Sequence, residues 1–327
     1  MNRLRLILPL IALLFPALLM SGDSREALES LRHAAEEGNP KAMWQLAELY
    51  DRGLPGLVEA DTVESLRLYR KAAEAGSPEA CNYLGFLFYN GKRLKQSTDS
   101  ALYWIERAAA AGDSRAANNL GWLLIEGKGV VHDNAKAMFW FRKAADAGLP
   151  AAQAQLADMM RLGRGCEADT AAAEQLYDAA IQGGLADAEK KLLAMSYRSY
   201  RSLAADSARV KGVYHYLHRA PVIGVTLFEI AAEKGDTVAL TLLGDAYARG
   251  QGVPFDFAKS AEYYHKAASM GEPSASYILS QLLEIYPDAI DAYEPDSSRR
   301  NPEYWSMKAE QRAVLTEEEC YRRLMSE

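Results

Sequence analysis

One spacing constrains the fold of this chain more than any other feature of its sequence. Seven glycines recur at equivalent places, separated by 38, 36, 36, 36, 51 and 36 residues. An alanine follows each glycine by four residues and a leucine follows it by eight, so both lie on one face of a helix. A repeat of this length predicts a stack of similar helical units, because one unit cannot bury its apolar face alone. The seven glycines are Gly38, Gly76, Gly112, Gly148, Gly184, Gly235 and Gly271.

Each unit carries the signals of two helices. The first, helix A, contains the alanine and the leucine, and in five units it ends at a glycine that suits a left-handed C-terminal cap, such as Gly53 or Gly91. A short loop then leads to an aspartate or serine, such as Asp61, that can cap the second helix, helix B, by accepting a backbone N–H bond. Glycine pairs in these loops, such as Gly163 and Gly165, follow a helix and not a strand, so we interpret them as loop closure and not as nucleotide-binding motifs.

Two further features of the unit concern its core. A glycine stands beside the leucine of helix A in several units, as Gly121 does, although glycine costs a helix about 1 kcal/mol relative to alanine. Close approach of the paired helix is the expected compensation. Helix B carries adjacent aromatic residues, Tyr103 and Trp104 in one unit and Tyr263 and Tyr264 in another, which we interpret as core.

The unit as a whole resembles a known repeat. The pattern A-x-x-x-L-G-x-x-Y-x-x-G-x-G-V, a capping Asp and then K-A-x-x-W/Y-Y/F-x-K-A-A-x-x-G is similar to the SEL-one-like repeat (SLR) family of the tetratricopeptide-like superfamily. Clear copies lie at 114–149 and 237–272, and the resemblance extends from about Glu26 to Tyr286. It implies an all-α fold, a right-handed superhelical solenoid of antiparallel helix pairs. It also implies a groove lined by the A helices, at positions three, six, ten and thirteen after each reference glycine.

In the N-terminal half of the chain these groove positions carry aromatic and amide side chains. Aromatic side chains dominate the binding energy of many interfaces, and asparagine can both donate to and accept from a peptide backbone. We predict that they hold an extended or helical segment of a partner protein; the alternative is that some of the aromatics pack between neighbouring A helices. The predicted groove residues are Trp44, Asn82, Phe86, Tyr89, Asn118 and Trp122.

The fifth unit breaks the period, since it is 51 residues long and so holds 15 extra residues between its helix A and helix B. The stretch Ser196 to Ala220 carries five cations and one acid, Asp206, together with several tyrosines. Two interpretations remain open: a basic patch for an acidic partner or a phosphate group, or a solvated or locally helical insert that packs its tyrosines. The five cations are Arg198, Arg201, Arg209, Lys211 and Arg219.

The two ends of the chain differ from the repeat. Arg3 and Arg5 precede an apolar run from Leu6 to Met20, which is the layout of a secretory signal peptide. The run is shorter than the roughly 20 residues that span a bilayer, so we expect cleavage and a secreted or periplasmic protein, with an uncleaved anchor as the alternative. The predicted organisation is a signal peptide at 1–22, a repeat solenoid at 23–286, and a loop and C-terminal capping helix at 287–327, the last helix running from about Glu303 to Met325.

Composition and the absence of known motifs argue against nucleic-acid binding, metal binding and catalysis. A net charge of −7 disfavours nucleic acid as a partner. Cys81, Cys166 and Cys320 lack the spacing of a metal site or a disulfide framework, and nucleophile, zinc and phosphate-loop motifs are absent from the sequence. We therefore expect no cofactor, no metal and no enzymatic activity. The predicted function is a protein–protein interaction scaffold or adaptor of the cell envelope or secretory compartment; the alternative is an envelope enzyme or glycan-binding protein that acts on cell-wall material through the basic insert.

Overall fold

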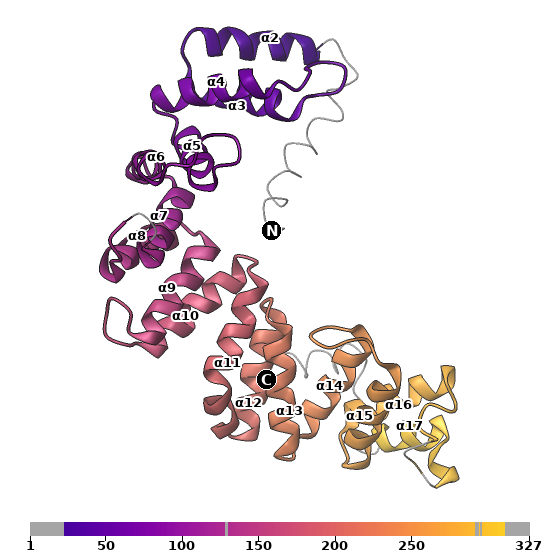
Figure 1. The fold of residues 1–327 in the computed structure, drawn as a ribbon. Helices are drawn as coiled ribbons and strands as arrows, with labels where there is room; N and C mark the ends of the chain where they lie inside the picture. Colours follow the sequence, from indigo (N-terminus) through magenta and orange to yellow (C-terminus); the bar gives the residue numbers. More distant parts are fainter. Residues whose placement is uncertain (1–22, 128–129, 292–293, 295, 311–327) are drawn as a thin grey trace. The chain divides into compact units, whose positions relative to one another are not determined.

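The structure, a computed structural model, describes residues 23–127, 130–291, 294 and 296–310. Within them the secondary structure is helical apart from one isolated bridge between Leu54 and Val58, so the predicted all-α class is confirmed. The chain divides into two compact units, Met1–Asp169 and Thr170–Glu327 (Figure 1). The predicted signal peptide, and the predicted last helix beyond residue 310, lie outside the described residues.

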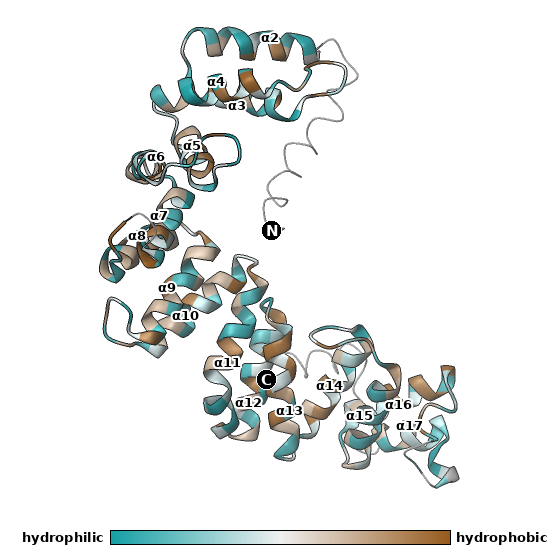
Figure 2. Cartoon of the chain, in the orientation of Figure 1, coloured by the Kyte–Doolittle hydropathy of each residue, from teal (hydrophilic) through white to brown (hydrophobic). Residues whose placement is uncertain are grey.

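In unit one (Met1–Asp169) each helix packs against the next one along the chain. Odd-numbered helices from α3 to α9 occupy the predicted A positions, and even-numbered helices from α2 to α8 occupy the predicted B positions. Each helix carries both hydrophobic and hydrophilic residues along its ribbon (Figure 2), and the hydrophobic ones supply its buried face. The helices are α2 (Asp23–Glu36), α3 (Pro40–Arg52), α4 (Thr62–Glu74), α5 (Pro78–Asn90), α6 (Thr98–Ala110), α7 (Ser114–Glu126), α8 (Asn134–Asp146) and α9 (Pro150–Leu162).

Polar side chains fix the start of the B helices in unit one, as the sequence predicts. The Asp61 carboxylate accepts hydrogen bonds from the N–H groups of Val63 and Glu64 at 2.9 and 3.0 Å. Ser97 and Asp133 cap α6 and α8 in the same manner. Each cap satisfies donors that a helix N-terminus otherwise leaves without a partner.

Glycines end the A helices, with one departure from the prediction. Gly91 and Gly127 adopt the left-handed conformation expected of a C-terminal cap. Gly53 has a positive φ of 70° but a ψ of 161°, so it is not the predicted left-handed cap. The reason is local, because the chain turns back at once and the Leu54 N–H donates to the Val58 carbonyl oxygen at 2.7 Å.

The glycines beside the recurring leucine lie where helix A touches helix B. A Cβ atom added at Gly121 would lie 2.8 Å from the ring of Phe141, closer than real Cβ contacts come. The loop glycine Gly165 approaches α8 equally closely, since a Cβ there would lie 2.6 Å from the Asn134 carbonyl oxygen. Close helix approach and loop closure are therefore confirmed as the roles of these two kinds of glycine.

The interpretation of the helix B aromatics as core is wrong for Tyr103. Its side chain is 53% exposed, whereas Ile105, two residues later, is buried. The buried position of helix B is the one held by Ile105, Phe141 and Tyr264. Two residues correspond to about 200° around a helix, so a residue two places before a core position faces solvent.

Unit two (Thr170–Glu327) continues the alternation and adds one helix. Neighbouring helices pack in order from α12 to α17, and α11 contacts both α10 and α13. The helices are α10 (Thr170–Gln182), α11 (Ala186–Ser202), α12 (Ala205–Leu217), α13 (Pro221–Glu233), α14 (Thr237–Arg249), α15 (Phe257–Ser269), α16 (Pro273–Ile285), the short 3₁₀ helix η2 (Ser297–Arg299) and α17 (Pro302–Glu310).

The 15 extra residues of the fifth unit fold mostly as helix α12. This helix packs on the following helix, α13, as helix A packs on helix B in the other units. A Cβ at Gly212 in α12 would lie 2.8 Å from the ring of Phe228 in α13, and Gly244 stands in the same relation to Tyr264. The insert is therefore helical, with Tyr200 and Tyr216 buried and Tyr197 and Tyr214 exposed.

Helix α13 begins without a cap of its own. Ala220 occupies its N-cap position, where other units carry aspartate or serine, and it offers no side-chain acceptor. The carboxylate of Glu189, in α11, accepts hydrogen bonds from the N–H groups of Val222 and Ile223 at 2.6 and 3.1 Å instead. A buried side chain from another helix therefore supplies the missing cap.

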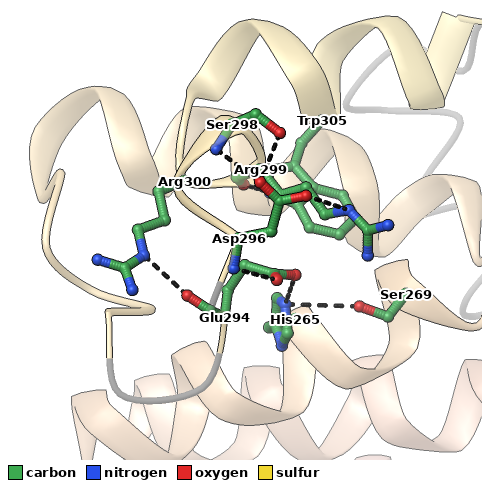
Figure 3. Close-up of polar contacts among 8 residues, drawn as sticks. All are labelled: His265, Ser269, Glu294, Asp296, Ser298, Arg299, Arg300 and Trp305. Carbon is green, nitrogen blue, oxygen red and sulfur yellow. Dashed lines mark hydrogen bonds and ion pairs between the residues drawn. The ribbon is translucent and has the colours of Figure 1, made fainter.

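The C-terminal segment closes the last repeat of unit two. Ile290 and Trp305 are buried against α16 residues of the core. A polar cluster joins the same segment to α15, since His265 Nε2 lies 3.0 Å from the Glu294 carboxylate (Figure 3). Burial raises the pKa of Glu294, but hydrogen bonds from His265 and from the Asp296 N–H outweigh that effect, so its pKa is lowered.

Candidate functional site

The predicted groove positions of unit one come from helices α3, α5 and α7, and two contacts show that α5 and α7 lie side by side. The Asn119 side-chain amide donates to the Asn82 oxygen at 3.0 Å. The Tyr89 hydroxyl lies 3.0 Å from the Glu126 carboxylate. Equivalent faces of consecutive A helices therefore meet along one surface, which we call the A-helix surface and which comprises the six predicted groove residues.

Two aromatic side chains of this surface are exposed. Phe86 is 41% exposed and Trp122 is 39% exposed, and they occupy the same position in α5 and α7. Trp122 lies edge-on against buried Phe141, with ring centroids 6.0 Å apart. Its outer face remains open to solvent, so both residues are available to an incoming side chain.

Trp44 behaves differently from these two, as the packing alternative expects. It is half-buried, and its ring centroid lies 5.0 Å from that of Tyr69 and 5.8 Å from that of Tyr83. Asp51 closes this aromatic cluster through an ion pair with Arg93. Burial raises the pKa of both tyrosines, as expected for phenols in a packed cluster. Trp44 thus joins α3, α4 and α5 and contributes less open surface than Phe86 or Trp122.

The Asn118 side chain is less exposed than the open pair, Phe86 and Trp122, and does not join a packed aromatic cluster as Trp44 does. Its side chain is half-buried, and its Oδ1 atom is shielded from solvent with no hydrogen-bond partner among the described residues. A buried oxygen without a donor is costly, by about 1–3 kcal/mol. Because this oxygen has almost no accessible surface, an incoming group reaches it only after the side chain rotates.

Charged side chains of both signs influence Glu48 of the A helix α3. Burial raises the pKa of Glu48, with further electrostatic effects from Arg52, Asp51, Arg115 and Glu79. Glu79 belongs to α5 and Arg115 to α7, so side chains of all three A helices act on this carboxyl group. The mixed charge suits a polar rim around an aromatic centre.

The five cations of the insert do not form one open patch. Arg209 pairs with Asp236 at 3.0 Å, Lys211 pairs with Glu174 at 2.8 Å, and Arg201 pairs with Glu233. Arg198 and Arg219 are exposed. Glu174 lies in α10, Glu233 in α13 and Asp236 at the N-cap of α14. The three paired cations therefore hold the insert against neighbouring helices.

A buried titratable pair lies beneath the insert. His215 in α12 is 2% exposed, and its Nδ1 atom lies 3.8 Å from the Asp178 carboxylate in α10. Burial, aided by Glu174, raises the pKa of Asp178 to about 6. Burial and then Lys211 lower the pKa of His215 to about 4. The pair is closed to solvent on the histidine side, which suits a structural role.

The described residues contain no candidate metal cluster and no candidate membrane span. No group of three or more His, Cys, Asp and Glu side chains in that part of the chain could hold a metal ion. Among the same residues no helix has the length and apolarity needed to cross a membrane.

Comparison with known proteins gives a consistent match. The family model described as Sel1 repeat matches residues 40–77, 78–113, 114–149, 150–185 and 237–272, together more than half of the chain. No curated protein matches.

Solved structures match over most of the chain. A protective antigen of uropathogenic Escherichia coli strains, which displays an SLR fold, is 27% identical with a TM-score of 0.50, and the match covers 88% of this chain and 64% of that one. This chain therefore spans less than two thirds of the length of that antigen. A Sel1 repeat protein from Oxalobacter formigenes is 26% identical over 89% of this chain and 96% of its own, with a TM-score of 0.41.

Proposed function

The chain belongs to the Sel1 repeat family, and on that premise we propose that it is a non-enzymatic scaffold or adaptor that binds a segment of a partner protein on its A-helix surface. Sel1 repeats generally serve as protein–protein interaction modules, and the aromatic pair Phe86 and Trp122 is the observation that carries the assignment to this surface. Large aromatics held open beside half-buried amides are what the centre of a protein interface requires.

The partner segment is proposed to bind through both apolar and polar contacts. Phe86 and Trp122 would cover an apolar side chain of the segment, and the half-buried Asn118 amide would hydrogen-bond its backbone. Asn82 and Tyr89 already bond to neighbours in α7, so they are proposed to hold the surface in shape. Trp44 is proposed to contribute mainly through packing of α3 against α4 and α5.

We further propose that the protein works in the cell envelope or secretory compartment. The support is the order of charged, apolar and small residues at 1–22, which is that of a secretory signal peptide. Intact mass measurement of the protein recovered from its native host tests this directly. A mass that lacks the first residues supports export with cleavage, and a full-length mass in the cytosolic fraction contradicts it.

Cross-linked affinity capture tests the binding function. The bait is the chain without residues 1–22, compared with its Phe86→Ala/Trp122→Ala variant and with a matched variant, Val63→Ala/Val131→Ala, that removes exposed apolar groups elsewhere in unit one. We expect one defined partner to be captured by the parent and the matched variant and lost, by about tenfold or more, with the aromatic variant. Equal capture by all three proteins would contradict a role for this surface.

The glycan-binding alternative draws less support from the arrangement of the insert's cations. The glycan-binding alternative depends on the basic insert, and three of its five cations are paired with acidic residues of neighbouring helices.

A further inference from the structure

Unit one carries a second exposed aromatic pair, on the B helices α6 and α8. Tyr103 is 53% exposed and Phe139 is 52% exposed, and they hold the same position in consecutive repeats. Each lies two residues before a buried core residue, so it points away from the A helix on which that core residue packs. This pair is therefore separate from the A-helix surface.

Each exposed ring belongs to a small assembly of two rings and one cation. The Arg107 guanidinium carbon lies 5.7 and 5.3 Å from the ring centroids of Tyr103 and Trp104. The same assembly recurs one repeat later, where Lys143 Nζ lies 4.9 and 5.1 Å from the rings of Phe139 and Trp140. Cation–π contacts of this kind hold the rings in place at the surface.

The cations of this assembly lack acidic partners. In the part of the chain that the structure describes, no carboxylate forms an ion pair with Arg107 or Lys143. Elsewhere on B helices the acidic partner is present, because Lys136 of α8 pairs with Asp133 and Arg67 of α4 pairs with Glu64. A chain of net charge −7 thus presents unpaired cations beside two exposed rings.

We propose that this B-helix surface is a second docking site, which binds an acidic segment of a protein partner in which carboxylates flank large apolar side chains. One apolar side chain of the segment would cover each exposed ring, and the neighbouring carboxylates would pair with Arg107 and Lys143, which are both exposed. The surface consists of Tyr103, Trp104, Arg107, Phe139, Trp140 and Lys143.

The composition of this surface favours a protein over an anionic membrane. Aromatic residues and arginine are the types enriched at protein hot spots. The surface carries two cations, whereas segments that bind anionic lipid headgroups carry clusters of about 4–8 lysines and arginines. The proposal extends the function proposed above, because a scaffold with two separate surfaces can hold two partners at once.

Fluorescence anisotropy with two labelled synthetic peptides tests the proposal on the chain without residues 1–22. The peptides share their tryptophan and leucine positions, and every other position is glutamate in one peptide and lysine in the other. We expect the glutamate peptide to bind about tenfold more tightly than the lysine peptide, and the preference to reverse in the Arg107→Glu/Lys143→Glu variant. The Tyr103→Ser/Phe139→Ser variant should weaken glutamate-peptide binding about tenfold, with its helix content checked by circular dichroism.

The matched control is Phe86→Ser/Trp122→Ser, which removes the other exposed pair and should leave glutamate-peptide binding within about twofold of the parent. The proposal is overturned by equal binding of the two peptides, by no binding of the glutamate peptide at millimolar concentration, or by loss of binding only in the control variant.

Vesicles of equal parts phosphatidylcholine and phosphatidylglycerol provide the last probe. Vesicle binding that depends on Tyr103 and Phe139 would overturn the proposal in favour of a membrane. Because the two variants affect different surfaces, failure here leaves the function proposed for the A-helix surface standing.

Discussion

At the residue scale, Asp178 and His215 are two groups that the fold buries at a thermodynamic cost. The pKa of Asp178 is raised to about 6, which means that its ionised form is disfavoured in the folded state. The pKa of His215 is lowered to about 4, so the histidine is neutral at physiological pH. A raised pKa for the acid and a lowered pKa for the base mean that folding favours the uncharged form of both groups.

We predict that Asp178→Asn stabilises the protein at pH 7, by about 1–2 kcal/mol after allowance for partial exposure of the carboxyl group. The folded protein binds the Asp178 proton more tightly than the unfolded chain does, so Asp178 by itself lowers the stability of the parent as the pH rises from about 4 to about 6, whereas His215 acts in the opposite direction in both proteins. The variant lacks that loss, and the two proteins should converge below pH 4. Urea denaturation from pH 3.5 to 8 measures the difference. A variant less stable than the parent at pH 7 would instead mean that the Asp178 anion pairs with protonated His215.

Glu189 supports a second prediction at this scale, because it supplies the only described side-chain cap of α13. Glu189→Ala removes an acceptor from two N–H groups and should cost about 2 kcal/mol of the free energy of unfolding. Glu189→Gln keeps a side-chain oxygen and should cost less. Exposed Lys190, the next residue, gives the control, since Lys190→Ala should stay within about 0.5 kcal/mol of the parent. Equal losses for the alanine and glutamine variants would rule out the capping role.

At the scale of paired helices, Gly121 sets how closely α7 approaches α8. Gly121→Ala should destabilise the protein by about 1–3 kcal/mol although alanine is the better helix former, because its Cβ would overlap the Phe141 ring. Adding Phe141→Leu makes room for that Cβ, so the double variant should lose less than the sum of the two single losses. Thermal unfolding of the four proteins measures this coupling. Strictly additive losses would mean that the two residues do not limit the approach.

The contact between His265 and Glu294 joins α15 to the segment that follows α16. A double-mutant cycle with His265→Gln and Glu294→Gln should give a coupling of about 1–3 kcal/mol near pH 6, because both side chains are shielded from solvent. The lowered pKa of Glu294 means that its contribution is present above the ordinary glutamate range and is lost as the pH falls through the folded value. The coupling should therefore disappear in acid. A coupling that persists below pH 3 would show that the carboxylate charge is not involved.

At the scale of the whole molecule, helices contact mainly their neighbours along the chain within each unit. Stability in such a repeat protein is approximately a sum of local terms and nearest-neighbour interfaces. Hydrogen exchange should thus detect the effect of Gly121→Ala in α5 to α9, where protection falls, while α14 to α16 keep their parental rates. Uniform loss of protection along the chain would indicate one cooperative unit instead.

The sequence predicted most of the fold, because the repeat is written in local signals. Glycine, alanine and leucine at fixed spacing give the number and order of helices in unit one, and Asp61, Ser97 and Asp133 mark where B helices begin. These features depend only on backbone geometry within one or two turns of the residue concerned. The same locality explains why family membership could be inferred from the residues alone.

The side-chain environments needed the tertiary structure. Tyr103 and Tyr264 look alike in sequence, yet one is exposed and the other buried, because a shift of two positions from the core register places the side chain on the solvent face. Trp44 and Trp122 are both predicted groove residues, at different positions of helix A, yet the rings of Tyr69 and Tyr83 cover Trp44 whereas Trp122 is 39% exposed.

Ion pairs between residues distant in sequence could not be predicted from the sequence either. The cations of the insert look like a free basic patch until Glu174, Glu233 and Asp236 are placed beside them. The order of helices was thus determined by the sequence itself, through interactions within a few residues. Which aromatics face solvent and which charges are paired was decided only by the fold, because both depend on residues some 30 positions away that packing brings into contact.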